Sequence, residues 1–354
     1  MGVQLGAPNT SVQFRSVDGG RFCYISAMEL RVGSAVDRYC IEGVIGEGGM
    51  AQVYLVRHRE LQSVHALKVL SFHGRKNRER LLQEGRLQSG FRHPNVVPVT
   101  DVIEIYHMPA LVMDYVPGPD LRMLFQHCKL TDVQVNELVR GILRGVIAAH
   151  QHGLVHRDLK PSNILIDLQD EQLIPRIADF GLAKNQFQAS EQRLTQTGAT
   201  LGTPGYMAPE QIRDAHNVDK RADIFSLGAI LYEAVTGRMA FDGTHTMEIW
   251  TRITDGQYTP INQIRPEVPV GIVDIIHAAL EPNPDQRIGD VQTLLDAWES
   301  VGGQVITQTG EPSKIWHGAT LNGVRDLVIQ RKKQIAQSRR DMMVLGSKAA
   351  KTID

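Results

Sequence analysis

The sequence predicts an α+β fold with two lobes, a small strand-rich lobe followed by a larger helical one. Three observations lead to this expectation. Short β-prone runs separated by glycine and polar breaks fill residues 38–116, the breaker cluster Pro117-Gly118-Pro119 follows, and stretches with helical spacing of apolar residues come after it. The 354-residue chain is 42% hydrophobic, enough for two packed cores with tails at both ends.

Five β-prone runs of the first lobe are expected to form strands: residues 39–44, 52–58, 63–70, 96–102 and 110–116. Between the third and fourth runs, residues 77–90 carry apolar side chains at helical spacing among charges, which predicts a short amphipathic helix. The breaker cluster after the last run indicates a hinge between the lobes, because proline and glycine end regular structure.

The second lobe is predicted to be mostly helical. Apolar residues recur at helical spacing in five stretches: residues 133–152, 224–236, 247–254, 270–281 and 291–300. The expected organisation is an N-terminal extension over 1–37, one domain over 38–302 and a tail over 303–354. Within the domain, the small lobe covers 38–116 and the large lobe covers 117–302.

The tail is basic, since residues 311–354 hold nine Lys or Arg against four Asp or Glu. Apolar residues recur every seven positions at Leu321, Val328, Ile335 and Met342, but the intervening heptad positions are half polar. The pattern leaves two arrangements open. The tail either rests on the large lobe as a helix or stays partly disordered, or it forms a helix that binds a partner or dimerises.

Composition narrows the class of protein. The net charge of −1 provides no global field that would recruit nucleic acid, and no run of about 18 apolar residues predicts a membrane span. The three cysteines are widely spaced and odd in number, which argues against a disulfide framework or a zinc site. The first 30 residues lack a signal-peptide pattern, so we expect a cytoplasmic protein.

Two segments of the second lobe carry the chemistry. The run His156-Arg157-Asp158-Leu159-Lys160-Pro161-Ser162-Asn163 places a carboxylate base and an amide five residues apart, and Asp179-Phe180-Gly181 places a second carboxylate on a turn. Together they resemble the catalytic loop and the metal-binding turn of protein kinases. The resemblance covers about residues 38–300 and implies a bilobal protein-kinase-like fold, with a β-rich N-lobe and a mainly helical C-lobe.

The resemblance also implies a role for each of these residues in phosphoryl transfer from ATP. Asp158 would accept the proton of the substrate hydroxyl, and Lys160 would reach the γ-phosphate. Asn163 and Asp179 would hold Mg²⁺, or Mn²⁺ in its place, because hard cations suit amide and carboxylate oxygens. ATP and a divalent metal are therefore expected to bind.

A glycine-rich loop precedes these segments, and its backbone N–H groups could approach phosphate oxygens without a Cβ clash. Its spacing also fits a dinucleotide-binding fingerprint, which should open a helix and meet an acidic residue about 20 positions on. A strand follows instead, and Lys68 stands at about that spacing, so this alternative is disfavoured. In a kinase the loop residues that bind ATP would be Ile45, Gly46, Glu47, Gly48, Gly49, Met50, Ala51, Gln52 and Val53.

Lys68 resembles the kinase lysine that binds the α- and β-phosphates. Its implied partner on the following helix is Glu84, for which Glu79 is the rival. The loop departs from the family at Ala51, which stands where the third glycine is usual. A methyl group there should cost little, and we do not infer inactivity from it.

The adenine site is expected around the strand that leads into the hinge. By resemblance, Val53 and Ala66 would sandwich the adenine ring. The backbone at Asp114 and Val116 would bond its edge. Asp120 has two open roles, as a ligand of the ribose or as the N-cap of a helix that begins at Leu121.

Other residues bear on substrate and regulation. Lys160 after the base is typical of serine/threonine kinases rather than tyrosine kinases. Thr195 and Thr197 resemble the autophosphorylated threonines of bacterial relatives, and Arg157 would pair with a phosphothreonine there; a plain polar loop is the alternative. Structural roles are implied for Arg157, Glu210, Asp223 and Arg287. Glu210 would form an ion pair with Arg287, and Asp223 would fix the catalytic-loop backbone.

The sequence therefore predicts a bacterial-type protein serine/threonine kinase. Its expected partners are ATP, protein substrates and a second copy of itself for trans-autophosphorylation. The alternative is a nucleotide-binding pseudokinase or scaffold that signals through its tail, but the catalytic lysine, the base and both metal ligands are all present. A small-molecule kinase of related fold is disfavoured by Ala208-Pro209-Glu210 and the long activation segment before it, which serve protein substrates.

Overall fold

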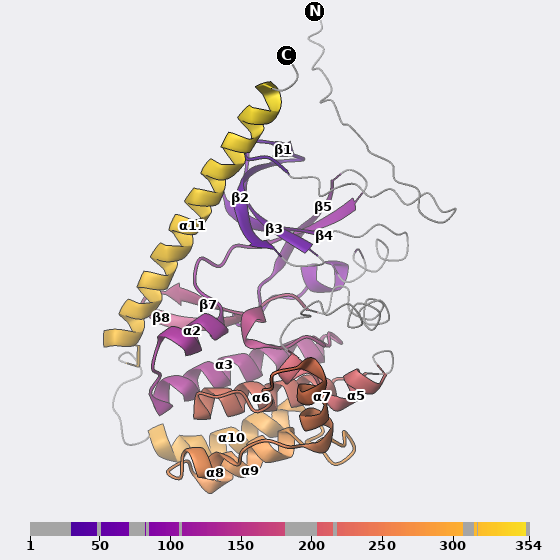
Figure 1. Ribbon diagram of the computed structural model, residues 1–354, viewed down its shortest axis with the longest axis vertical. Helices are drawn as coiled ribbons and strands as arrows, with labels where there is room; N and C mark the ends of the chain where they lie inside the picture. The colour runs from indigo at the N-terminus through magenta and orange to yellow at the C-terminus, as the bar shows by residue number, and fades with distance from the viewer. Residues whose placement is uncertain are drawn as a thin grey trace, which may run out of the picture.

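The structure is a computed structural model that describes residues 30–47, 51–70, 82, 85–105, 108–180, 204–214, 218–306, 315–316 and 318–351. It has the two-lobe α+β fold that the sequence predicts (Figure 1). A curved sheet forms the N-lobe, and packed helices form the C-lobe. One long helix, α11 (Gly318–Lys351), runs beside both lobes.

The N-lobe is an antiparallel sheet. Its strands lie in the spatial order β1 (Ala35–Val36), β2 (Tyr39–Glu47), β3 (Ala51–His58), β4 (Val64–Leu70), β6 (Met108–Asp114) and β5 (Val99–Ile105). Side chains alternate between the two faces of a strand, and the inward ones, such as Ile41, Val56 and Leu67, form the N-lobe core. The first three predicted strands lie where expected.

The fourth and fifth strands begin and end at other residues than predicted. We expected strands at 96–102 and 110–116, whereas β5 begins at Val99 and β6 ends at Asp114. Pairing with the C-lobe and a proline explain the later start of β5. Val96 and Val97 pair with Ile177 of the C-lobe, and Pro98 has no N–H to donate to a ladder. The sheet pairing therefore starts only after the proline.

The five predicted helices of the C-lobe are all present. Its helical segments are α2 (Leu121–His127), α3 (Asp132–Gln151), η3 (Pro204–Tyr206), α5 (Pro209–Arg213), α6 (Arg221–Thr236), α7 (Thr246–Asp255), α8 (Ile261–Ile264), α9 (Val270–Ala279) and α10 (Val291–Ile306). Thr131 and Gln134 form a capping box that starts α3, and Asp120 caps α2 by accepting the N–H of Met123 at 2.8 Å. In the predicted helix at 77–90, residue 82 and residues 85–89 are helical; the others except Gly90 lie outside the described residues.

A hairpin that we did not predict lies between the N-lobe sheet and the C-lobe helices (Figure 1). It consists of β7 (Ile164–Gln169) and β8 (Gln172–Ile177), and the short helix η1 (Pro161–Asn163) precedes it. The turn uses Asp170 and Glu171, both with positive φ. Because Ile164 pairs with Ile177, the hairpin brings Asn163 at its start close to the segment that ends in Asp179.

Both predicted tails contribute to the packing. Leu30 and Val36, placed in the extension, belong to the N-lobe core, while residues 1–29 lie outside the described part. In the tail, Trp316, Leu321 and Val324 belong to the C-lobe core. None of the helices in the described residues is long and apolar enough to cross a membrane.

Candidate active site

Asp223 of α6 holds the catalytic loop, residues 156–163, from behind. Its carboxylate accepts the backbone N–H groups of His156 at 2.8 Å and Arg157 at 2.7 Å, and it lies 2.8 Å from Nε2 of His150. The Asp223 side chain is completely buried, so these partners replace the water that the carboxylate lost. The contact with His150 was not predicted, because α3 and α6 meet only in the folded lobe.

Arg157 has an unusual backbone. Its φ of +62° lies in the left-handed region, which costs a non-glycine residue about 1–3 kcal/mol. Two hydrogen bonds offset that cost: the N–H of Arg157 donates to Asp223, and its carbonyl accepts Nε2 of Gln211 at 2.8 Å. Gln211, on α5, is a positioning residue that the sequence analysis missed, since it lies just beyond the Ala208-Pro209-Glu210 segment we considered.

His156 links the catalytic loop to the metal-binding turn. Its Nδ1 accepts the N–H of Asp158 at 3.2 Å, so Nε2 carries the proton and donates to the carbonyl of Ala178 at 2.8 Å. Its ring also lies 4.8 Å from the ring of Phe180. Complete burial lowers the pKa of His156, which keeps the ring neutral and suited to both hydrogen bonds.

The predicted base, Asp158, is oriented by two neighbours. Nζ of Lys160 lies 3.1 Å from Asp158 Oδ2, and Nδ2 of Asn163 donates to the same oxygen at 3.3 Å. The same Nδ2 donates to the Asp158 carbonyl at 2.8 Å. The Asp158 side chain is 22% exposed, so a substrate hydroxyl could reach it.

Lys68 of β4 and Asp179, which follows β8, form an ion pair with 2.7 Å between Nζ and Oδ1. It joins the two lobes. The Lys68 side chain is 13% exposed and the Asp179 side chain 34%, so the pair is only partly shielded from water. The sequence suggested Glu84 as the partner of Lys68; Glu84 lies outside the described residues, so that pair remains a prediction.

The donor atoms at this place fit a divalent metal. Asn163 uses its Nδ2 as a donor to Asp158, so its Oδ1 is the atom it can offer a cation. Asp179 adds a carboxylate, and Ala178 between them donates its N–H to the Asn163 carbonyl at 2.8 Å. An amide oxygen and a carboxylate are ligands that Mg²⁺ accepts, with waters and phosphate oxygens completing its shell.

A hydrophobic cluster joins the N-lobe and C-lobe where we expected adenine. Its buried members are Ala66, Val97, Val99, Leu111, Met113 and Val116, with Ile45, Ala51, Val53, Leu165 and Ala178 packed against them. The predicted adenine residues Val53, Ala66 and Val116 thus come together. Asp114, which the resemblance places at the adenine edge, gives its N–H to the Pro98 carbonyl at 3.2 Å.

The glycine-rich loop connects β2 and β3. Gly46 pairs with Val53 and Glu47 with Gln52, whose Nε2 donates to Glu47 Oε1 at 3.1 Å. Ile45 and Ala51 also lie on these strands, whereas Gly48, Gly49 and Met50 lie outside the described residues. The strands that flank the loop therefore form the hairpin that the prediction requires.

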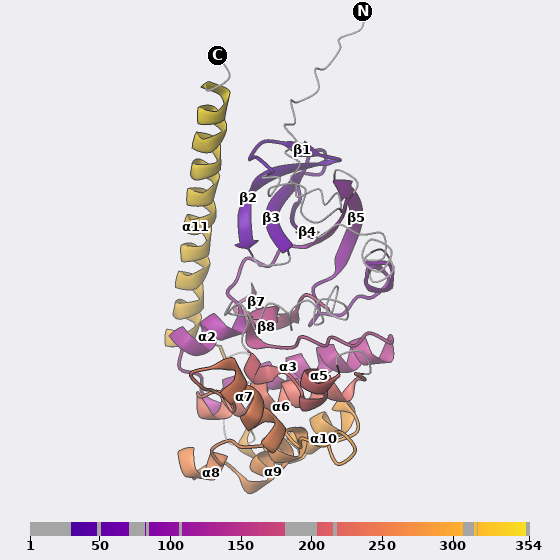
Figure 2. The same cartoon turned by 45° about the vertical axis from the view of Figure 1, so that its right-hand side comes forward.

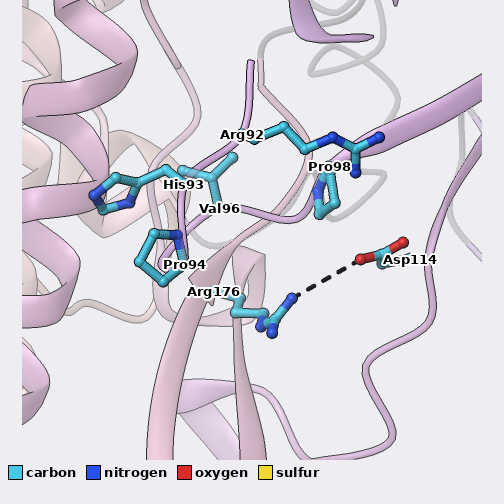
Figure 3. Close-up of a pocket in the computed structure, with 7 residues that line it drawn as sticks. All are labelled: Arg92, His93, Pro94, Val96, Pro98, Asp114 and Arg176. Carbon is cyan, nitrogen blue, oxygen red and sulfur yellow. Dashed lines mark ion pairs between the residues drawn. The ribbon is translucent and has the colours of Figure 1, made fainter. Parts of the chain in front are cut away.

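A shallow pocket of about 310 Å³ lies apart from these catalytic groups (Figure 3). Arg92, His93, Pro94, Val96, Pro98, Asp114 and Arg176 line it. Arg176 lies 4.0 Å from the Asp114 carboxylate across the pocket. Among the predicted site residues only Asp114 lines this pocket, so the pocket adjoins the predicted nucleotide site at that one residue.

Glu210 and Arg287 form the predicted ion pair with bidentate geometry. Nη1 and Nη2 of Arg287 donate to the two Glu210 oxygens at 2.7 and 3.0 Å. The Arg287 side chain has no exposed surface. The pair fastens α5, at the end of the activation segment, to the loop before α10.

A partly buried acid, Glu233 of α6, accepts the hydroxyl hydrogen bond of Tyr206 at 2.5 Å. Burial raises the pKa of Glu233, although the tyrosine bond opposes this. Burial, together with the Glu233 carboxylate, raises the pKa of Tyr206. The pair supports η3, whose Tyr206 carbonyl also accepts the Ser226 hydroxyl at 2.7 Å.

Glu233→Gln is expected to become more stable than wild type as the pH rises. The raised native pKa of Glu233 means that the native state holds its proton more tightly than the unfolded state does. The contribution of Glu233 to the unfolding free energy of wild type therefore falls as the pH rises above about 4.5. The difference in unfolding free energy should grow by at most about 1.4 kcal/mol per pH unit. Urea unfolding of both proteins at pH 4.5, 6 and 7.5 measures it, and a pH-independent difference would contradict the assignment.

The predicted phosphorylation sites Thr195 and Thr197 lie outside the described residues. Their predicted partner, Arg157, is described. Its Nη2 donates to the Val218 carbonyl at 3.3 Å, while its buried Nε has no hydrogen-bond partner within the described part of the chain. A buried guanidinium N–H of this kind suits a phosphate oxygen.

Comparison with known proteins identifies the family. Residues 39–298 match the family described as "Protein kinase domain". The chain belongs to this family. This kinase domain is 33% identical over 271 residues to the serine/threonine-protein kinase PrkC of Bacillus subtilis, an alignment that covers 73% of this chain and 41% of PrkC. Protein kinases use ATP and a divalent metal.

Solved structures agree with the fold. A double mutant of the PknI kinase domain of Mycobacterium tuberculosis is matched with a TM-score of 0.61 and 26% identity, over 78% of this chain and 100% of that one. Rad53 1–466 in complex with AMP-PNP gives the same TM-score and identity, over 74% of this chain and 65% of that one. The matched region spans about two fifths of the length of curated relatives such as PrkC.

Proposed function

We propose that this chain is a protein serine/threonine kinase that transfers the γ-phosphoryl group of ATP to hydroxyl groups of proteins. The Lys68–Asp179 ion pair of 2.7 Å carries the proposal. Through Ala178, which bonds both His156 and Asn163, this pair is fixed beside the loop that holds Asp158. A phosphate-binding cation, a metal-binding carboxylate and a base thus lie in one site, as phosphoryl transfer requires.

Each residue of the site would have one task. Asp158 accepts the proton of the attacking hydroxyl, and Lys160 donates a hydrogen bond to the phosphoryl group that moves. Lys68 binds the α- and β-phosphates. Asn163 Oδ1 and the Asp179 carboxylate would hold Mg²⁺, which neutralises charge on the phosphates when it is bound. The names of relatives such as PrkC and the AMP-PNP bound to Rad53 support this proposal.

The proposed substrate class includes the chain itself. Thr195 and Thr197 would be phosphorylated by a second copy, and the buried Nε of Arg157 would bind the resulting phosphate. We propose Mg²⁺ as the usual metal and Mn²⁺ as a substitute, and expect chelation to stop transfer. A cytoplasmic location remains a prediction from the sequence.

Autophosphorylation tests the proposal. The full chain incubated with Mg-ATP should gain phosphate at Thr195 or Thr197, measured by intact mass and by peptide mapping. Lys68→Met is the control and should gain none, because it loses the phosphate-binding cation. If wild type binds ATP but incorporates no phosphate and labels no protein substrate, the chain is a nucleotide-binding scaffold instead. If phosphate appears only outside residues 190–203, the Thr195 and Thr197 assignment is wrong.

A further inference from the structure

Helix α11 bridges the two lobes. In both views it runs from beside α2 of the C-lobe up to β2 of the N-lobe (Figures 1 and 2). Its seam toward the kinase domain consists of the residues Val324, Val328, Arg331, Ile335, Ser338 and Met342, which are all less exposed than their neighbours on the outer side. The spacing of three and four residues is the heptad pattern seen in the sequence. The seam therefore packs on the chain's own domain.

The first half of α11 is anchored in the C-lobe. Leu321 and Val324 are buried in the C-lobe core. The Thr320 hydroxyl bonds the Lys129 carbonyl at 3.3 Å, and Gln134 of the α3 capping box donates to the Ile315 carbonyl at 3.0 Å just before the helix. Burial of this kind fixes the start of the helix relative to the C-lobe.

The second half of α11 contacts β2, the strand that leads into the glycine-rich loop. The Ser338 hydroxyl accepts the N–H of Val44 at 3.4 Å, beside a register shift in the β2–β3 pairing. Ile335 lies directly on Gly43, where a Cβ would stand 3.4 Å from its Cγ2. Met342 packs against the N-lobe core. The helix therefore holds β2 as well as the C-lobe.

Between these two anchors, Arg331 contacts the hinge. Its Nη1 donates to the carbonyl of Gly118, and its guanidinium lies 6.0 Å from the centre of the Tyr115 ring. Gly118 is pressed against β7 on its other side, because a Cβ on it would stand 1.8 Å from the Ile166 carbonyl oxygen. The hinge is thus held between β7 and Arg331. It includes Val116, whose backbone we assign to the adenine edge.

We propose that Arg331 is a positioning residue for nucleotide binding. It fixes residues 115–118 in the conformation that binds adenine, while the same helix fixes β2, the strand that precedes the glycine-rich loop. A hinge that is already ordered loses less conformational entropy when ATP binds, so its affinity is higher. Arg331 does not touch the reacting groups, and therefore it should act on binding rather than on transfer. The inference rests on the proposed function.

The test compares Arg331→Ala with Arg340→Ala in the full chain. Arg340 is an exposed arginine on the outer side of the same helix, so the control removes the same charge. Arg331→Ala should raise KM for ATP and the dissociation constant for ADP by roughly 5- to 20-fold, because a hydrogen bond from a charged donor is lost. The kcat should change by less than about 3-fold, and Arg340→Ala should match wild type in every measurement. Arg331→Lys, which can still donate to the carbonyl, should recover part of the affinity.

Calorimetry with ADP measures binding without transfer, which separates the two proposals. A wild-type chain that binds ADP but transfers no phosphate refutes the kinase activity alone. Equal ADP affinities in wild type and Arg331→Ala refute the role of Arg331 alone, as would tighter binding in the variant, which would mean that α11 restrains the hinge. Hydrogen exchange gives a second readout: the amides of Tyr115, Val116 and Gly118 should exchange faster in Arg331→Ala, and unchanged rates would overturn the inference.

Discussion

Asp158→Asn is expected to slow phosphoryl transfer by about 100- to 10,000-fold, the usual contribution of a general base. The amide has nearly the shape of the carboxylate, and its Oδ1 can still accept from Lys160 and Asn163 as Asp158 Oδ2 does. It cannot take up the hydroxyl proton at neutral pH. The loop should therefore keep its geometry while losing its base.

Measuring nucleotide binding separates the loss of the base from a general distortion of the site. The dissociation constant for ADP should stay within about 3-fold of wild type, because Lys68 and Asp179, which we propose for the phosphate end of the site, remain intact. Transfer is measured in a single turnover on a threonine peptide. Asp274→Asn, at an exposed position of α9, is the matched control and should transfer at the wild-type rate. Transfer by Asp158→Asn at the wild-type rate would refute the base assignment.

The proximity of the proposed catalytic groups could be predicted because short motifs carry them. Asp158, Lys160 and Asn163 are so close in the chain that the loop alone brings them together. Asp179 could be placed only by resemblance, since the β7–β8 hairpin that brings it near Asn163 was not predicted. The two strands are short, and the helical patterns on either side gave the stronger signal.

Contacts between segments far apart in the chain could not be predicted from the sequence. Arg331 bonds Gly118, which is 213 residues away, and the heptad pattern of α11 gave the helix without the surface it covers. The seam includes Arg331 and Ser338, whose polarity seemed to weaken the pattern. Arg331 bonds the hinge and Ser338 bonds β2. The polar positions that interrupt the heptads are therefore the ones that make specific contacts with the kinase domain, which a coiled-coil seam would not need.

The predicted strand at 96–102 shows a different limit of prediction from sequence, the choice of the neighbouring strand. Its residues are as β-prone as predicted, but Val96 and Val97 find partners in the C-lobe at Ile177. Hydrophobic runs predict that a segment is extended, whereas the neighbouring strand is chosen by tertiary packing. The same packing creates the Lys68–Asp179 pair, because each residue comes from a different lobe.

Arg287→Ala is expected to destabilise the fold by about 3–5 kcal/mol, since removing one partner of a buried pair leaves the other charge uncompensated. Beyond Glu210, the guanidinium donates to three backbone carbonyls, those of Arg221 at 2.7 Å, Glu281 at 2.9 Å and Pro282 at 3.3 Å. It also lies 5.1 Å from the centre of the Phe225 ring. Alanine would remove the partner of all these groups at a position where the arginine side chain has no exposed surface.

Urea unfolding of Arg287→Ala against Arg221→Ala decides whether burial is the cause. Arg221 forms an equally short pair with Asp285, 2.7 Å, but the Asp285 side chain is 81% exposed. Exposed pairs contribute about 0–1 kcal/mol, because water screens the charges and the side chains lose entropy. Similar losses in the two variants would contradict the argument, since the ion pairs match in length and differ in exposure. A loss confined to Arg287→Ala would mean that the activation segment is fastened to the C-lobe by a contact whose strength comes from the exclusion of water.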